Sequence, residues 1–158
     1  VEHPVTEQVT GRDLIALQLR VAGGEGLGLE QSDIRVCGHA IECRINAEDP
    51  SNGFLPSPGR ITRWEPPRGE GLRLDTHARA GYLVPPFYDS MIGKLIASGP
   101  TRDVAAARLV QAAQGFCIEG PRTTLPLAAY IVAHADFLSN DLTTRWLEVR
   151  ALPAFAPS

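Results

Sequence analysis

Apolar residues recur at helical spacing in three parts of the chain. The first stripe follows Thr10 and Asp13, which have the spacing of a capping box, and it ends at Gly23. Two further stripes near the carboxyl end predict helices over about 101–114 and 123–138, each preceded by a threonine that can cap it. Between the first stripe and these two, the helical period disappears and short apolar runs take its place.

The region from 33 to 48 alternates in the way expected of a strand. Ile41 and Ile45 point to one face. The other face is polar: Glu42, Arg44 and Asn46. Further short strands are expected over three ranges: 61–64, 72–75 and 91–97.

The strands follow one another without intervening helices, which favours an α+β fold with a mainly antiparallel sheet and packed helices. We expect one compact unit from about residue 35 to 148. Its central strand should carry Glu42 and Arg44, and the two late helices should pack on the sheet.

Composition narrows the class of protein. The chain has 158 residues, a formal net charge of −3 and 44% hydrophobic residues, so it is globular, and its charge argues against nucleic-acid binding. It has no apolar run of about 18 residues and no signal-like amino terminus, so we expect no membrane span. Three cysteines are typical of a reducing compartment, and a cytoplasmic location is expected. The chain opens at Val1 without a methionine, which suggests a piece of a longer protein.

Three potential metal ligands fall in the same strand region: Cys37, His39 and Cys43. Along a strand, His39 and Cys43 would lie roughly 13 Å apart, at about 3.3 Å per residue. Zinc ligands must lie about 2.0–2.3 Å from the ion, so the spacing argues against a metal site. Cys37 and Cys43 would lie farther apart still, about 20 Å, which argues against a disulfide between them. We expect small buried residues here and no metal.

The polar face of the strand leaves two interpretations open. Glu42 and Arg44 are consistent with a solvated ion pair worth about 0–1 kcal/mol. Alternatively, Arg44 presents its planar, permanently charged fork to an anion. Glu2 beside His3 is likewise either a catalytic carboxylate–imidazole pair or a frayed end. No catalytic-triad spacing, phosphate-binding glycine loop or nucleophile elbow is present.

Four collinear blocks of sequence resemble a known family. They cover residues 1–7, 43–50, 54–59 and 88–95. In this order they are similar to the carboxyl-terminal part of biotin carboxylase, the ATP-grasp enzyme of the biotin-dependent acyl-CoA carboxylases. The resemblance runs from Val1 to about Glu148 and leaves a tail over 149–158.

The resemblance implies a division of the chain. Residues 1–34 would be the end of the ATP-grasp domain, and residues 35–148 the biotin carboxylase C-terminal domain. In such an enzyme Glu2 would sit on a sheet whose other strands precede Val1. We therefore expect residues 1–9 to be mobile or to pair with another chain, because their strand lacks its partners.

The resemblance also implies a reaction and roles. ATP phosphorylates bicarbonate to carboxyphosphate, and the carboxyl group passes to biotin on a carrier protein. The glutamate matching Glu2 is the base that deprotonates bicarbonate, and the backbone of Val1 matches a position that contacts bicarbonate. The arginine matching Arg44 holds bicarbonate and stabilises the biotin enolate.

Partners follow from the same resemblance. Arg73 matches a position at the family's homodimer interface, and Asp89 one that links this interface to the active site, although a surface ion pair or a turn cap would explain each equally well. Glu70 stands where the interface loop often has an aromatic residue. A biotin carboxyl carrier and a carboxyltransferase are the expected partners. Pro4 is more typical of the acyl-CoA carboxylases than of pyruvate carboxylase, and the acyl-CoA stays open among acetyl, propionyl and methylcrotonyl.

The family's ATP- and Mg²⁺-binding parts match nothing in the chain. We therefore expect a fragment that binds no ATP, Mg²⁺ or biotin and is inactive alone, within a parent enzyme that is a ligase. The alternative is a non-catalytic module of the same fold, used for dimerisation or docking. The presence of both Glu2 and Arg44 favours the enzyme, since a docking module would have no use for this pair.

Overall fold

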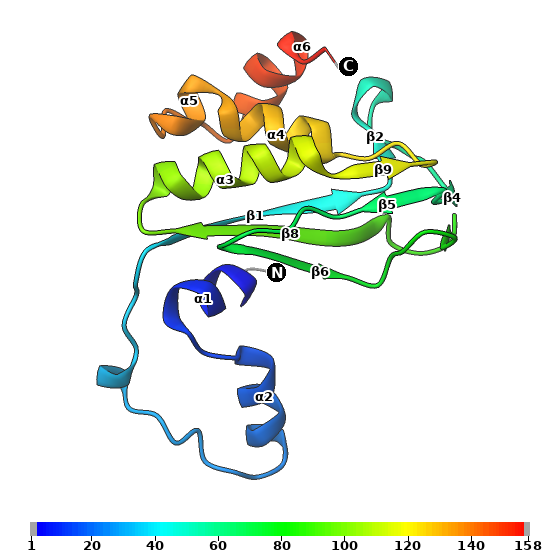
Figure 1. Ribbon diagram of the computed structural model, residues 1–158. Helices are drawn as coiled ribbons and strands as arrows, with labels where there is room; N and C mark the ends of the chain where they lie inside the picture. The colour runs from blue at the N-terminus through cyan, green and yellow to red at the C-terminus, as the bar shows by residue number, and fades with distance from the viewer. Residues whose placement is uncertain (1–2, 157–158) are drawn as a thin grey trace.

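A three-stranded antiparallel sheet organises the structure, a computed structural model that describes residues 3–156 (Figure 1). Its strands are β1 (His39–Asn46), β8 (Met91–Gly99) and β6 (Leu72–Thr76), in the order β1-β8-β6. The shorter strands form antiparallel pairs: β2 (Glu48–Asp49) with β3 (Leu55–Pro56), β4 (Gly59–Arg60) with β7 (Leu83–Val84), and β5 (Arg63–Glu65) with β9 (Cys117–Glu119). The predicted α+β class is confirmed.

The central strand is β8, not the strand of Glu42 and Arg44 as the sequence suggested. β8 pairs with β1 on one side and with β6 on the other, so β1 lies at an edge. The reason is visible in the burial of β8, where Ile92, Leu95 and Ile96 are at most 1% exposed. A strand covered on both faces reads as a nearly continuous apolar run, whereas β1 alternates.

Two helices cover one face of the sheet and build the core. They are α3 (Arg102–Gly115) and α4 (Leu125–Ala133), which lie together above the strands in Figure 1. The hydroxyl of Thr101 accepts a hydrogen bond from the Val104 amide, the cap predicted for α3. The buried cluster joins the sheet to α3 and α4, and its large members include Ile45, Leu95, Leu109, Leu125 and Phe116.

The helix expected over 123–138 is two helices. α4 ends at Ala133, and a separate short α5 (Ala135–Leu138) follows. His134 between them adopts an extended backbone with φ −68° and ψ 138°, and its ring nitrogen caps α5 by accepting from the Asp136 amide. The helical spacing of apolar residues continues across His134, so periodicity alone does not predict the break.

The opposite face of the sheet is covered by α1 (His3–Thr10), which corrects our expectation for the described part, 3–9, of the segment 1–9. From His3 onward this segment is helical and packed on β1 and β8. Pro4 is among the most buried residues of the chain, in the first turn where proline is tolerated. Gly11, at φ +66°, follows the helix, and its amide donates to the Glu7 carbonyl. Val1 and Glu2 lie outside the described residues.

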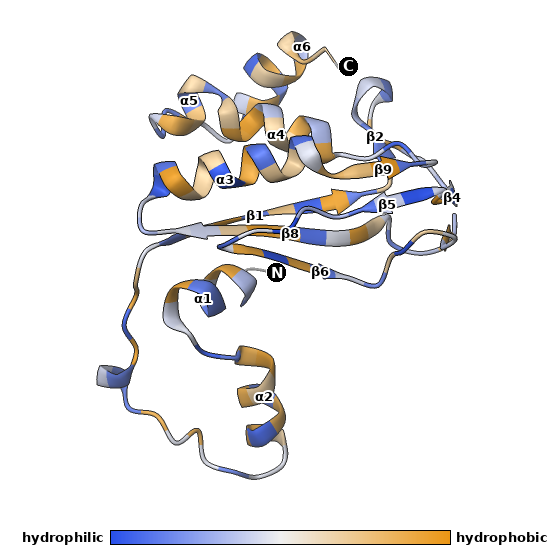
Figure 2. Ribbon diagram, viewed as in Figure 1, coloured by the Kyte–Doolittle hydropathy of each residue, from blue (hydrophilic) through white to orange (hydrophobic). Residues whose placement is uncertain are grey.

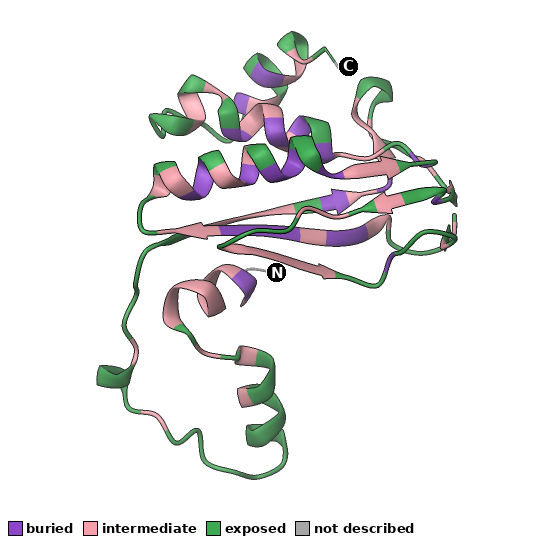
Figure 3. Cartoon of the chain, viewed as in Figure 1, coloured by how far each residue is buried: buried purple, intermediate pink, exposed green. Residues whose placement is uncertain are grey.

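A second helix, α2 (Leu14–Ala22), projects away from the sheet. Its N-cap is Asp13, which accepts from the Ala16 amide; Thr10, the expected cap, instead donates to the Thr6 carbonyl within α1. Figure 2 shows apolar residues along α2, and Figure 3 shows that most of the helix is exposed. Leu19 is 69% exposed. The chain returns to β1 through residues 23–38, which contain the short turn η1 (Gln31–Asp33).

The carboxyl-terminal segment folds back over α4 and α5. It contains η3 (Leu147–Ala151), a turn of π-helix, and α6 (Leu152–Ala154); a further short turn, η2 (Pro50–Asn52), lies between β2 and β3. Trp146 and Ala151 are buried. Within residues 3–156, no helix combines the length and the apolar character needed to cross a membrane. The domain boundaries at residues 34 and 148 remain predictions.

Candidate functional site

Arg44 is an exposed residue of the edge strand β1, on the sheet face opposite α3. Its neighbours on this strand, Cys43 and Ile45, point into the core, so the alternation predicted from the sequence is confirmed. The register places Arg44 directly across from Lys94 of β8. Directly opposed residues of an antiparallel pair point to the same face, so the two cations stand side by side.

The next residue in this row is Asp75 of β6, and its carboxylate is paired with Arg73. In the β6–β8 register, Asp75 lies directly across from Lys94. However, Arg73 holds both carboxylate oxygens of Asp75, through Nε at 2.7 Å and Nη2 at 2.8 Å. Among residues 3–156, neither Arg44 nor Lys94 forms an ion pair. The site therefore presents two cations with no carboxylate partner in the described part of the chain.

Two buried oxygens without hydrogen-bond partners lie on the strand beside Arg44. They are Glu42 Oε2 and Asn46 Oδ1, for which no described residue supplies a donor. The weak ion pair that the sequence allowed between Glu42 and Arg44 does not form. Buried polar oxygens are normally satisfied, so these two atoms call for donors that residues 3–156 do not supply.

The backbone at Arg44 is held by the residue that precedes α4. The Thr124 hydroxyl donates to the Arg44 carbonyl at 3.2 Å and accepts from the Asn46 amide at 3.0 Å. The Thr124 amide in turn donates to the Asn46 carbonyl at 3.0 Å. Thr124 therefore satisfies backbone groups at the free edge of β1. These hydrogen bonds hold the backbone from which the Arg44 side chain projects.

The first described residues lie on the same face as Arg44. α1 packs there, with Glu7 bonded to Arg73 and the Ser98 hydroxyl donating to Gln8 Oε1 at 3.2 Å. The predicted base Glu2 and the predicted bicarbonate contact Val1 precede this helix immediately but lie outside the described residues. Their roles stay predictions.

Arg73 is the centre of an internal ion network. Besides Asp75, it bonds Glu7 Oε2 through Nη1 at 2.6 Å, and its side chain is only 29% exposed. Burial tends to raise the pKa of Glu7, but the hydrogen bonds from Arg73 and from the Leu14 amide lower it, and the net shift is downward. The interface role expected of Arg73 remains a prediction, since the described contacts are all within the chain.

Asp89 and Glu70 have local partners. Asp89 accepts from the Met91 amide at 2.8 Å and so fixes the turn that leads into β8. Glu70 pairs with Arg108 at 3.0 Å, although its own side chain is 89% exposed. Neither contact tests the interface roles that the resemblance implies.

The cysteine and histidine residues near β1 form no joint site. The expectation of buried residues is wrong for Cys37 and His39, which are exposed before and at the start of the strand. Cys43 points into the core, where burial raises the pKa of its thiol to about 12. A thiol with such a pKa is a poor nucleophile at neutral pH. Residues 3–156 contain no group of three or more His, Cys, Asp or Glu side chains placed to share a metal ion.

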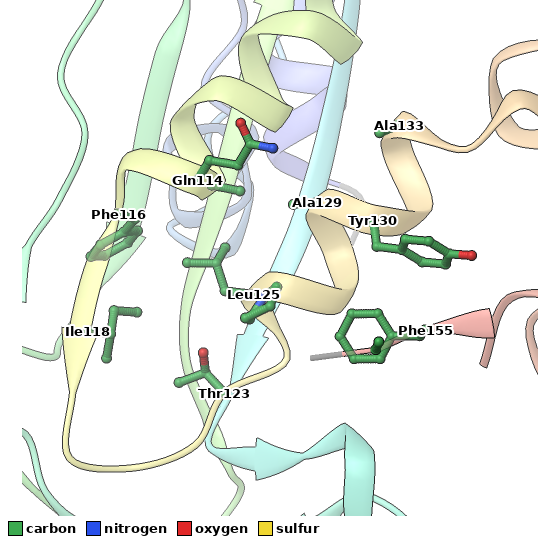
Figure 4. A pocket seen from close by; sticks show the side chains of 12 residues that line it. Gln114, Phe116, Ile118, Thr123, Leu125, Ala129, Tyr130, Ala133 and Phe155 are labelled. Atoms are coloured by element: carbon green, nitrogen blue, oxygen red, sulfur yellow. The ribbon is translucent and has the colours of Figure 1, made fainter. Parts of the chain in front are cut away.

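A hollow of about 510 Å³ lies on the other side of the sheet, between α3, α4 and the carboxyl-terminal segment (Figure 4). Phe116, Leu125, Tyr130 and Phe155 are among its lining residues, and no charged side chain lines it. It is separated from Arg44 by the sheet and the core. Its lining offers shape and apolar contact but no acid, base or cation.

The sequence identified Arg44 but missed Lys94. Both fall within blocks that resemble the family, but the resemblance implies a role for the arginine alone. Residues 91–97 are apolar except for Gly93 and Lys94, and only the pairing of β1 with β8 shows that this lysine lies on the face of Arg44. The register is a non-local property that neither strand encodes by itself.

Comparisons with known proteins agree with this arrangement. The profile of the Biotin carboxylase C-terminal domain matches residues 42–149. Biotin carboxylase 1 of Bacillus subtilis is 53% identical over 148 residues, which are 94% of this chain and 33% of that protein. The 2-oxoglutarate carboxylase small subunit of Hydrogenobacter thermophilus is 48% identical over 94% of this chain and 31% of its own length.

A solved structure is similar over almost the whole chain. The biotin carboxylase domain dimer of H. thermophilus 2-oxoglutarate carboxylase, in complex with MgADP, ADP and bicarbonate, superposes with a TM-score of 0.94. It is 46% identical, over 99% of this chain and 35% of that chain. The chain thus spans about a third of the length of the relatives it matches. The fold, the Arg44 strand and these likenesses together show that the chain belongs to the biotin carboxylase C-terminal domain family and corresponds to the carboxyl-terminal part of biotin carboxylases.

Proposed function

We propose that the chain supplies one side of the active site of a biotin carboxylase, a ligase that uses ATP and bicarbonate to carboxylate biotin on a carrier protein. The observation that carries the proposal is the exposed Arg44 side chain on a rigid strand, without a carboxylate partner among residues 3–156. Preorganised positive charge of this kind stabilises negative charge that develops during a reaction.

The roles of the chain's own residues follow from this position. Glu2 would remove the proton of bicarbonate, and the backbone of Val1 would contact the same anion. Arg44 would hold bicarbonate through its planar fork and later face the negative charge that develops on the ureido group. Biotin, when bound, supplies the ureido nitrogen that accepts the carboxyl group.

ATP and Mg²⁺ would be held by the rest of a longer polypeptide. The described residues contain no cluster of carboxylates for a metal ion, and phosphate binding usually needs a backbone cradle together with the metal. The chain by itself would therefore bind no nucleotide tightly and be inactive. The exposed apolar residues of α2, such as Leu19, support a packing partner for this helix outside the chain.

The wider assembly is part of the same proposal. A homodimer would use the region of Arg73 and Asp89, with Glu70 in its interface loop, and a biotin carboxyl carrier and a carboxyltransferase would complete the reaction in the cytoplasm. We favour an acyl-CoA as the final acceptor. Relatives also include carboxylases named for pyruvate and for 2-oxoglutarate, so the acceptor depends on the carboxyltransferase.

A hybrid enzyme tests the proposal. This chain would replace the matching third of B. subtilis biotin carboxylase 1, and biotin-dependent cleavage of ATP would be measured. We expect activity in the hybrid and none in the isolated chain, which should also show no micromolar affinity for MgATP in calorimetry. A folded hybrid without activity, or tight ATP binding by the chain alone, would contradict the proposal.

A further inference from the structure

Lys94 and Arg44 form an unusual pair in the sheet. They are directly opposed in the β1–β8 register, so their Cβ atoms lie about 4.5–5.5 Å apart. Like charges in this position destabilise a sheet, because each cation raises the local positive potential at the other. Because the pair lowers the stability of the sheet, we look for a function that both cations serve.

No carboxylate of residues 3–156 forms an ion pair with Arg44 or Lys94. Asp75, next to Lys94 on β6, has both oxygens bonded to Arg73. Glu7 of α1 is bonded to Arg73 and to the Leu14 amide. Glu42 lies diagonally across from Lys94, at a spacing of about 7–8 Å, and forms no ion pair with it.

The surroundings of Lys94 favour a positioned ammonium group. It is the only half-buried residue in the stretch from Ile92 to Ala97 of β8, whose other members are all buried. Its aliphatic stem is therefore packed at its base, and Lys94 shares the sheet face of Arg44, which is exposed. Both charges project from hydrogen-bonded strands rather than from loops.

We propose that Lys94 is a second cation of the anion site at Arg44, and that together they bind the bicarbonate ion. This inference rests on the proposed biotin carboxylase function. Arg44 can engage two oxygens of a planar oxyanion with its fork, and the Lys94 ammonium can face the remaining oxygen as a point charge.

The reaction gives a second cation on this chain a role. When the hydroxyl proton of bicarbonate passes to the carboxylate of Glu2, the bound carbonate carries two negative charges. One of its oxygens then forms a bond to the γ-phosphorus of ATP, while the bond from that phosphorus to the β–γ bridging oxygen breaks and ADP leaves. Lys94 matches the second negative charge as it develops, which lowers the cost of deprotonation in the site.

The experiment uses the hybrid enzyme described above, with Lys94→Met as the test and Lys94→Arg as the variant that keeps the charge. Arg145→Gln is the matched control, because Arg145 is a cation on the carboxyl-terminal segment with a side chain 77% exposed. KM for bicarbonate, KM for MgATP, kcat and the melting temperature would be measured for each. Varying both substrates separates bicarbonate from a phosphate group of ATP as the anion that Lys94 holds.

For Lys94→Met we expect KM for bicarbonate to rise about tenfold or more, the loss of one charge-assisted contact, with KM for MgATP nearly unchanged. The melting temperature should be equal or higher, since the repulsion is removed. Lys94→Arg should retain most of the affinity, and Arg145→Gln should match the parent. An unchanged KM for bicarbonate in an active Lys94→Met hybrid, a rise in KM for MgATP instead, or a lower melting temperature would overturn the inference. Loss of activity in the hybrid that carries the native chain would instead count against the proposed function.

Discussion

Glu7 Oε2 and Arg73 Nη1 lie 2.6 Å apart and join α1 to β6 across 66 positions of the sequence. The other carboxylate oxygen of Glu7 accepts from the Leu14 amide at 2.8 Å, at the start of α2. The Glu7 side chain is only 9% exposed. A single carboxylate thus connects two helices to the sheet on the face that carries Arg44.

Replacing Glu7 with Gln should loosen α1. The amide can still accept from Leu14 but cannot neutralise Arg73, so we expect a loss of about 1–3 kcal/mol in the free energy of unfolding. Hydrogen exchange of residues 3–10 and a denaturant titration measure the effect. Glu65→Gln is the control, because the Glu65–Arg63 pair is exposed on both sides and should contribute within about 0.5 kcal/mol. Equal effects of the two substitutions would contradict the structural role of Glu7.

The same carboxylate predicts a pH dependence. The pKa of Glu7 is lower in the folded chain, so the unfolded state binds the proton more tightly and folding gains stability from ionised Glu7. This contribution is complete above the ordinary glutamate pKa of about 4.3 and is lost as the pH falls through the lower folded value. Exchange protection of α1 should therefore weaken below about pH 4 in the native chain. In Glu7→Gln this dependence should be reduced; a dependence of equal size there would assign it to other carboxylates.

Arg44→Ala should separate catalysis from folding. Within the hybrid carboxylase we expect turnover to fall by about 10²–10³-fold, as for the loss of one preorganised donor to a developing negative charge. The melting temperature should hardly change, because Arg44 is exposed on an edge strand and bonds no carboxylate of residues 3–156. Biotin-dependent ATP cleavage measures the loss, with Arg145→Ala as the control. Near-normal turnover would remove Arg44 from the reaction.

Local features of the sequence predicted the parts of the fold that depend on local physics. The cap at Thr101, the alternation of 41–46 and the strand at 91–97 are all present, because capping and period depend on neighbouring residues. The alternation placed Arg44 correctly on the polar face of its strand. Its roles, and those of Glu2 and Val1, still await experiment.

Other features depend on contacts distant in sequence. α1 has only eight residues, too few for a stable isolated helix, and its packing on β1 and β8 is what supports it. The edge position of β1 follows from strand order, and the pairing of Arg73 with Glu7 follows from the packing of α1 on the sheet. The position of Lys94 opposite Arg44 also depends on strand register, so neither strand alone predicts it.

Gly120→Ala should destabilise the chain at the turn after β9. Gly120 has φ +114°, a conformation that side chains with a Cβ rarely adopt, and a Cβ there would overlap the Arg60 carbonyl oxygen. We expect the free energy of unfolding to fall by at least about 2 kcal/mol, which lowers the melting temperature by roughly 4–8 °C. Gly115→Ala, at the end of α3 with open space around its Cβ, is the control and should be neutral or stabilising. Equal melting temperatures would show that the backbone adjusts at Gly120.

Asp136→Ala should release the carboxyl-terminal segment. Asp136 Oδ2 accepts from Trp146 Nε1 at 2.8 Å and from Arg150 Nη1 at 3.0 Å. The hydrogen bond from Trp146 is the main cause of the lowered pKa of Asp136, followed by that from Arg150, so the carboxylate stays ionised and holds both groups. The segment also packs through Phe155 on Tyr130, with ring centroids 5.5 Å apart. Without the carboxylate, the buried N–H of Trp146 loses its hydrogen bond to Asp136. An unpaired buried donor costs free energy, so opening of the segment, which lets water bond this N–H, becomes more favourable.

The readout is tryptophan fluorescence, since Trp146 is only 6% exposed and should shift its emission to longer wavelength when the segment detaches. The second tryptophan, Trp64, packs edge-on against Phe116 in the core and should keep its emission. Proteolysis within residues 142–156 should become faster, because local opening exposes the backbone. Asp141→Ala is the matched control: Asp141 is 73% exposed and lies 3.8 Å from Arg150, so its loss should leave the spectrum unchanged. If Asp136→Ala leaves both the emission and the cleavage rate at native values, the apolar contacts of Trp146 and Phe155 hold the segment without the carboxylate.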